Sequence, residues 1–179
     1  PTKGTLQRAG AEVGLPGGSL QYYKTTYQYQ RYFPLTRTYT LMLNGEAGYG
    51  GGSGGKPLPF FKNFFAGGVN SVRGFRTSTI GPKDEDGNPR GGSHRLLGNA
   101  EFLFPFPGLK YDKSVRLGVF VDAGMVAEKY DAGEFRYSTG VSLFWSSPVG
   151  PLKISLAKPL NAQTSDRKQA FQFTFGGAF

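Results

Sequence analysis

The sequence predicts an all-β fold, an antiparallel transmembrane β-barrel wall, from three observations. Eight runs of residues alternate between apolar or aromatic side chains and small or polar ones, without a convincing helical period. Tyrosines and phenylalanines gather near the ends of these runs, where a membrane strand meets the boundary of water and lipid. The stretch 51–94 lacks the alternation and forms one long loop, which a compact domain seldom keeps unless the loop has a function.

Turn-forming residues separate the eight runs, and each run is near the roughly 10 residues that a tilted membrane strand needs. The predicted strands are 4–14, 20–32, 38–50, 95–106, 113–124, 136–146, 151–160 and 169–179. The first has the weakest alternation. In the second, Tyr23 and Tyr27 oppose Lys24 and Gln28, and in the third Tyr39, Leu41 and Leu43 begin a similar apolar face. Because neighbouring side chains of a strand point to opposite faces, one face is predicted to meet lipid and the other an aqueous lumen.

The four middle strands repeat this division. Their outward sets are Leu96, Ala100, Phe102 and Phe104; Val115, Leu117, Val119 and Val121; Tyr137, Val141, Leu143 and Trp145; and Leu152, Ile154 and Leu156. The alternate positions include Glu101 and Asp122, so two carboxylates are predicted on the lumen face of neighbouring strands.

The last strand carries aromatic side chains on one parity. They are Phe171, Phe173, Phe175 and the terminal Phe179. Small or polar residues, among them Gly176, take the other parity, as in a barrel strand between lipid and water. The alternative for this strand alone is the edge of a sheet over a soluble core.

Composition narrows the possible functions. The chain has 179 residues, 38% of them hydrophobic, and no run of about 20 apolar residues that could form a membrane helix. It has no cysteine and one histidine, so we expect no metal site, no cofactor and no enzyme activity. The net charge of +9 is scattered along the chain, so no nucleic-acid partner is expected. Because the chain opens at Pro1 without methionine, we expect a mature fragment of a longer protein.

Three motifs make the interpretation more specific. The long loop contains Phe64-Phe65-Ala66-Gly67-Gly68-Val69-Asn70-Ser71-Val72-Arg73-Gly74-Phe75, and its V-R-G-F core resembles the sixth extracellular loop of the BamA family of outer-membrane barrel assembly factors. The segment 119–124 resembles the F-x-D-x-G strand motif of that family at Phe120, Asp122 and Gly124. The segment 145–152 resembles its penultimate turn. The similarity extends from about Gly4 to Phe179.

The resemblance implies a location and a function. Residues 1–179 would form a single C-terminal barrel fragment, the last eight strands of a sixteen-stranded barrel, with the loop 51–94 folded into the lumen. It would belong to an insertase that assembles β-barrel proteins into the outer membrane of Gram-negative bacteria. Its partners would be outer-membrane lipid and lipopolysaccharide, unfolded β-barrel clients and accessory outer-membrane lipoproteins. Self-association could supply the missing strands, because eight strands enclose too narrow a barrel for such a loop.

The loop motif predicts an internal latch. A guanidinium that leaves water loses hydration, which bidentate bonds to carboxylates can offset. We therefore expect Arg73 within salt-bridge distance of Glu101, Asp122 or both, the same partners that the resemblance implies. Within the motif Val72 to Phe75, Gly74 would allow a sharp turn and Phe75 would wedge the loop against the wall. The alternative is a solvated arginine.

The C-terminal strand is predicted to be the functional strand, beside which client strands would pair. In the family, the seam beside this strand is a lateral gate, and the glycine that matches Gly176 is its kink. The strand of Phe171, Phe173, Phe175 and Phe179 also resembles the targeting signal that clients present. The alternative for Gly176 is a glycine that merely fits a crowded lumen.

Other functions remain open at this point. A two-partner secretion pore shares the arginine motif, although the Gly150-Pro151-Leu152-Lys153-Ile154 opening favours the assembly factor. A small passive barrel anchor would hold its long loop outward. The stretch 50–56 matches a phosphate-loop pattern, but Pro57 follows it and no helix start is available, so we interpret its glycines as a flexible strand exit.

Overall fold

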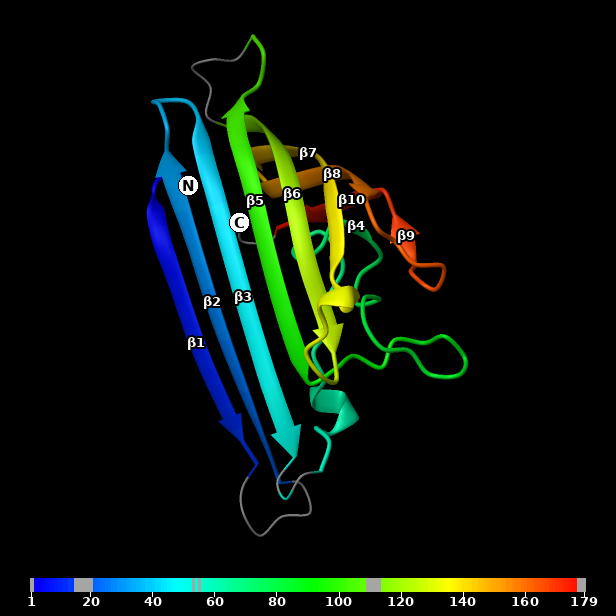
Figure 1. Cartoon of the computed structure of the whole chain (residues 1–179). Helices are drawn as coiled ribbons and strands as arrows, with labels where there is room; N and C mark the ends of the chain where they lie inside the picture. The colour runs from blue at the N-terminus through cyan, green and yellow to red at the C-terminus, as the bar shows by residue number, and fades with distance from the viewer. Residues whose placement is uncertain (1, 15–20, 53, 55, 109–113, 177–179) are drawn as a thin grey trace.

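One antiparallel sheet dominates the computed structural model, which describes all residues except 1, 15–20, 53, 55, 109–113 and 177–179 (Figure 1). Its strand order is β1-β2-β3-β5-β6-β7-β8-β10, and the bounds are β1 Gly4–Val13, β2 Tyr22–Pro34, β3 Thr40–Gly52, β5 His94–Pro105, β6 Val115–Ala127, β7 Arg136–Ser147, β8 Gly150–Pro159 and β10 Phe171–Phe175. A two-stranded sheet pairs β4, Gly74–Phe75, with β9, Lys168–Gln169. The short helices are η2, Phe60–Lys62, and η3, Ala132–Glu134. Among the described residues, no helix is both long enough and apolar enough to cross a membrane.

The sheet is an open, curved wall. In Figure 1, β1, β2, β3, β5 and β6 follow one another across the front, and β7, β8 and β10 curve behind them around β4. Within the described chain, β1 pairs only with β2, and β10 pairs only with β8. The predicted eight-stranded antiparallel wall is therefore confirmed, and among the described residues its two edges do not pair with each other.

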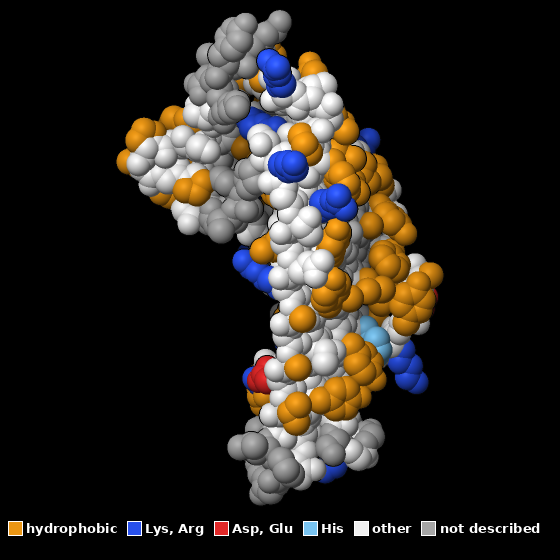
Figure 2. Space-filling model, turned by 90° about the vertical axis from the view of Figure 1, so that its left-hand side faces the viewer, with side chains coloured by type: hydrophobic (Ala, Val, Ile, Leu, Met, Phe, Trp, Pro, Cys, Tyr) orange, Lys and Arg blue, Asp and Glu red, His pale blue; other side chains and the backbone are white. Residues whose placement is uncertain are grey.

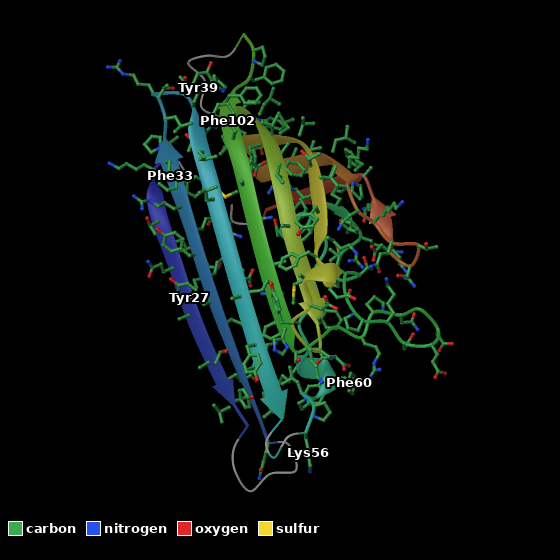
Figure 3. The ribbon with its side chains drawn as sticks, in the orientation of Figure 1. Tyr27, Phe33, Tyr39, Lys56, Phe60 and Phe102 are labelled. Atoms are coloured by element: carbon green, nitrogen blue, oxygen red, sulfur yellow. The ribbon has the colours of Figure 1, made fainter. Side chains whose placement is uncertain are left out.

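The outward face of the wall is apolar. Large hydrophobic side chains are exposed along almost every strand: Tyr23, Tyr27, Leu43, Tyr49, Val119, Val121, Tyr137, Val141, Trp145, Leu156, Phe171, Phe173 and Phe175. Figure 2 shows hydrophobic side chains gathered in a band along one side of the molecule. At one end of the wall, Phe33, Tyr39 and Phe102 lie near the strand ends, and the rings of Tyr39 and Phe102 stack with centroids 5.7 Å apart (Figure 3). Such aromatics are typical of strands that end at a membrane boundary.

The inward face of the wall is polar. Its buried polar side chains are Thr40, Glu101, Asp122, Arg136, Ser138, Ser142, Ser155 and Gln172. A soluble sheet buries its apolar face, whereas this sheet exposes it, which is the division expected between lipid and an aqueous lumen. The face assignments predicted from alternation agree with the structure.

The middle part of the long loop between β3 and β5 lies against this inward face. A small apolar cluster forms between loop and wall from Ala66, Val72, Phe75, Ile80, Leu97 and Val126. Because all neighbouring strands are antiparallel, this loop shares one end of the wall with the connection 160–170, which contains β9. The two connections meet where β4 pairs with β9.

Three predicted boundaries were wrong. The last strand was expected over 169–179, but β10 begins at Phe171, because Lys168–Gln169 pairs with the loop instead, and residues 177–179 lie outside the described chain. The glycines 50–52 belong to β3 and are not a flexible exit. They fit there because a side chain at Gly52 would lie 2.6 Å from two backbone oxygens of the loop. The loop itself is consequently shorter at both ends than 51–94.

Candidate functional site

Two neighbouring strands present carboxylates to the loop. Glu101 on β5 and Asp122 on β6 have side chains that are 0% exposed. The antiparallel register pairs Glu101 with Phe120, and Asn99 with Asp122. All four side chains therefore fall within one small area of the inward face.

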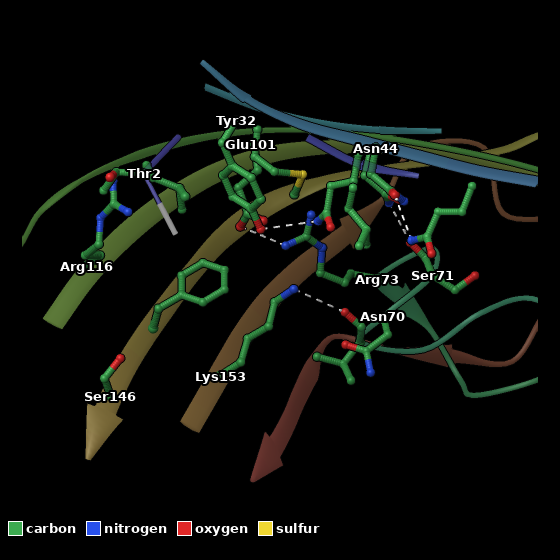
Figure 4. Close-up of a pocket in the computed structure, with 18 of the residues that line it drawn as sticks. Thr2, Tyr32, Asn44, Asn70, Ser71, Arg73, Glu101, Arg116, Ser146 and Lys153 are labelled. Carbon is green, nitrogen blue, oxygen red and sulfur yellow. Dashed lines mark hydrogen bonds and ion pairs between the residues drawn. The ribbon is translucent and has the colours of Figure 1, made fainter. Parts of the chain in front are cut away.

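Arg73 from the tip of the loop occupies this area and is 2% exposed (Figure 4). Its Nε and Nη2 donate to the two oxygens of Asp122 at 2.7 Å each, and its Nη1 donates to Glu101 Oε1 at 2.8 Å. The backbone N–H of Arg73 also donates to Asp122 Oδ2 at 3.0 Å. Both predicted contacts are present, and the pairing with Asp122 is bidentate, the geometry that guanidinium and carboxylate groups favour.

The F-x-D-x-G motif forms a receptor for the loop motif because its three residues share the inward parity. The Phe120 ring lies beneath the guanidinium of Arg73, with its centroid 3.4 Å from Cζ. Asp122 binds the same guanidinium, and Gly124 leaves room for Val72, whose Cγ2 would be 2.5 Å from a side chain at the glycine. Each of the three residues of the F-x-D-x-G motif thus contacts Val72 or Arg73 of the loop motif.

Gly74 and Phe75 complete the contact on the far side of Arg73. Gly74 has a φ of +87°, a left-handed conformation that favours glycine. A side chain there would lie 3.2 Å from atoms of Ala157 and Pro159, so the backbone passes close to β8. Phe75 is 0% exposed within the apolar cluster.

Other polar groups hold the carboxylates in place. Asn99 Nδ2 donates to Asp122 Oδ1 at 2.9 Å and to the carbonyl of Ser71 at 2.7 Å, and the Ser142 hydroxyl donates to Glu101. A cavity of about 510 Å³ lies beside the pair, and Arg73, Glu101 and Lys153 line part of it (Figure 4). The arrangement fixes the position of the loop tip on the wall.

A second anchor holds the loop near its start, and the sequence did not single it out. Phe64 is 3% exposed, with Lys24 Nζ 4.1 Å and Arg95 Cζ 5.3 Å from its ring centroid. It packs over Gly48, where a side chain would lie 2.6 Å from the ring. The F-x-A-G-G spacing includes Phe64, but no local pattern identifies its partners.

A third contact ties the loop to the connection 160–170. Asp166 accepts from Arg136 Nε at 2.6 Å and from Lys83 Nζ at 3.4 Å, and its side chain is 2% exposed. Burial raises the pKa of the Asp166 carboxyl, but the hydrogen bond from the Gln163 amide and the charges of Arg136 and Lys83 outweigh burial. The pKa of Asp166 therefore lies below its ordinary value.

The remaining predicted residues lie apart from Arg73. Phe171, Phe173 and Phe175 point outward and are more than half exposed. Gly176 has a φ of +73° and directly follows the last strand, and no atom of the described residues lies within 4 Å of the position of a side chain there. Phe179 lies outside the described residues. Within the described part of the chain, no three His, Asp or Glu side chains converge as ligands for a metal ion.

Comparisons with known proteins agree with this architecture. The family model of the Omp85 superfamily domain matches residues 1–179. The outer membrane protein assembly factor BamA of Neisseria meningitidis serogroup B is 43% identical over 211 residues, covering 100% of this chain and 26% of that protein. The protein of the same name from Nitratidesulfovibrio vulgaris is 29% identical, covering 100% of this chain and 23% of its own length. The chain thus spans about a quarter of these relatives.

A solved structure has the same fold. The crystal structure of BamA from Haemophilus ducreyi lacking POTRA domains 1-3 matches with a TM-score of 0.89 and 32% sequence identity. The match covers 97% of this chain and 38% of that one. Almost the whole open wall therefore corresponds to part of a larger protein.

Proposed function

The chain belongs to the Omp85 superfamily, and on that premise we propose that it forms the C-terminal part of the membrane barrel of an outer-membrane protein assembly factor. The observation that carries the proposal is the join between the two motifs, V-R-G-F on the loop and F-x-D-x-G on β6, within a wall that exposes its apolar face. A passive anchor has no need of a buried arginine that holds a long loop on the inward face.

The proposed activity lowers a physical barrier and breaks no bond. In hydrocarbon, each unpaired backbone amide costs several kcal/mol, so an isolated strand cannot enter the bilayer by itself. An exposed strand edge can pair with an incoming strand and satisfy those amides as the strand inserts. We assign this role to the free edge of β10, where Gly176 would kink the chain and release the pairing locally.

The proposed role of Arg73 is to latch the loop to the wall. A guanidinium is expensive to bury alone, and removing one partner of a buried pair costs about 3–5 kcal/mol. The loop therefore stays on the inward face as long as Glu101 and Asp122 hold Arg73. The loop would then line the lumen beside the edge where clients pair.

The proposed lipid and protein partners follow from the apolar outward face and the polar inward face of the wall. The apolar outward band would contact outer-membrane lipid and lipopolysaccharide in a Gram-negative bacterium. Unfolded β-barrel proteins would be the clients, and accessory outer-membrane lipoproteins would be partners of the full-length protein. Upstream strands of that protein, or a second copy, would pair with β1 and complete the wall.

A reconstitution experiment tests the proposal. The full-length protein carrying Arg73→Ala is placed in lipid vesicles, and folding of an added barrel client is followed by its protease resistance. Client folding is expected to fall at least about tenfold, which corresponds to about 1.4 kcal/mol and is less than the expected loss of latch energy. Arg76→Ala is the matched control, because Arg76 is an exposed arginine of the same loop. Equal client folding by both variants contradicts the proposed latch, and no client folding by the unmodified protein contradicts the insertase.

A further inference from the structure

The last strand has a short ladder. β10 pairs with β8 over five residues, Phe171 to Phe175, whereas β7 pairs with β8 over ten. Before Ala170 the chain leaves the sheet, because Lys168–Gln169 pairs with Gly74–Phe75 and the Arg76 amide donates to the carbonyl of Arg167 at 2.8 Å. The start of the C-terminal segment is therefore attached to the loop, whereas the backbone bonds to β8 run from Ala170 to Gly176.

Gln172 joins the rest of that segment to the loop motif. This inward side chain in the middle of β10 is 5% exposed. Its Nε2 donates to the carbonyl of Phe75 at 2.7 Å, and its Oε1 accepts from the amide of Gly74 at 3.4 Å. A buried amide side chain needs partners for both its donor and its acceptor, and the backbone of the loop motif supplies both.

These contacts form a continuous link across the inside of the wall. Asp122 on β6 holds Arg73, the next two residues of the loop hold Gln172, and Gln172 lies on β10. Between β6 and β10 in the sheet lie β7 and β8, so the link spans two strands. Ser155, the residue directly opposite Gln172 on β8, has a hydroxyl without a partner among the described residues. The side-chain tie of Gln172 is thus to the loop.

From this geometry we propose that Gln172 is a positioning residue that couples the arginine latch to the last strand. When Arg73 is seated between Glu101 and Asp122, the Gly74–Phe75 backbone lies where Gln172 can bind it, and β10 is held against β8. When Arg73 leaves its site, β10 loses this support and keeps only its short ladder. The role of this coupling in client insertion rests on the proposed function. The loop would then control how firmly β10, the edge where clients would pair, is held.

Hydrogen exchange of backbone amides in the full-length protein in lipid discs tests the coupling. The variants are Gln172→Leu, Arg73→Lys and the two combined. Leucine is similar in size but forms no hydrogen bond, and lysine keeps the charge but cannot form the bidentate pair. Thr174→Val is the matched control, since Thr174 also faces inward on β10 and no side-chain bond to the loop is found for it in the described structure.

We expect Gln172→Leu to accelerate exchange over 171–175 about tenfold, as the loss of one or two hydrogen bonds predicts. Arg73→Lys should accelerate exchange over the same residues, although Arg73 does not touch β10. The double variant should exchange no faster than the faster single variant, because both changes break one link. The control should leave exchange unchanged.

Two results would overturn the coupling. One is unchanged exchange over 171–175 in Arg73→Lys, a result that decides the matter even if Gln172→Leu does not fold. The other is a double variant whose acceleration equals the product of the two single accelerations. Because exchange is measured without clients, a coupled protein that fails to fold clients refutes the proposed function and leaves this inference standing. A protein that folds clients but shows no coupled exchange supports the proposed function and refutes this inference.

Discussion

The two ends of the sheet are held in different ways. At the N-terminal end, β1 pairs with β2 over ten residues and β2 with β3 over thirteen, so long backbone ladders hold these strands. At the C-terminal end, β10 has a ladder of five residues to β8, and its Gln172 bonds to the backbone of the loop. On the proposed coupling, release of Arg73 loosens the C-terminal edge, whereas the long ladders keep the N-terminal strands paired.

Removing the carboxylate partner of Arg73 should cause the largest difference in stability between the two ends of the sheet. Asp122→Ala leaves Arg73 buried without its bidentate partner and should cost about 3–5 kcal/mol. The loss should appear as faster hydrogen exchange in β10 and in the loop, with β1 to β3 unchanged. Asp86→Ala, an exposed carboxylate of the same loop, is the control. Equal destabilisation at both ends of the sheet would refute the comparison.

Arginine substitutions on the outward face should lower the folding free energy by similar amounts at both ends of the sheet. This result would distinguish contact with lipid from contact with the loop. Val121→Arg, at the centre of β6, should cost about 2–4 kcal/mol near the bilayer midplane. Tyr27→Arg in β2 should be similarly costly. Folding free energy in lipid vesicles measures both, with Val149→Arg in the exposed turn as the control. In a soluble sheet, exposed substitutions of this kind stay within about 0.5 kcal/mol, and such values would contradict the membrane assignment.

A methyl group added to the wall should lower stability where the loop packs on the wall and leave it unchanged where nothing lies above the glycine. Gly124→Ala places its Cβ 2.5 Å from Val72 Cγ2 and should cost about 1–3 kcal/mol through overpacking. Gly45→Ala in β3 meets nothing within 4 Å and is the matched control. Urea unfolding of the two variants should therefore differ, and equal midpoints would mean that Val72 does not press on Gly124.

Acid should weaken the contact between the two connections by a smaller amount. The pKa of Asp166 lies below the ordinary aspartate value of about 3.9, so its bonds to Arg136 and Lys83 stabilise the folded state at neutral pH. This stabilisation is lost as the pH falls through the lowered pKa. Proteolysis of the connection 160–170 should increase below about pH 4. In Asp166→Asn, that connection should be equally accessible at every pH, and a variant that keeps the acid response would exclude Asp166 as its cause.

Sequence reasoning succeeded where a residue follows the two-residue period of a long strand. Glu101 and Asp122 were placed on one face by parity alone, and Arg73 was matched to them because a buried guanidinium needs carboxylates. The same parity placed Gln172 inward, but nothing in a single strand indicates which backbone it meets.

The contacts that were missed all depend on irregular segments. The pairing of Gly74 with Gln169 involves strands of two residues, too short for any period. The contacts of Asp166 join two connections whose mutual register no local pattern defines. The predicted start of the last strand was too early for the same reason, since the alternation includes Gln169, which pairs with the loop.

A density map of the full-length protein in lipid discs, resolved to side chains, tests the central claim most directly. We expect the Arg73 guanidinium between Glu101 and Asp122 on the inward face, with Gln172 bonded to the Gly74–Phe75 backbone. Lipid should lie along the opposite face. A map with Arg73 in open solvent, or with the outward valines covered by protein, would contradict it.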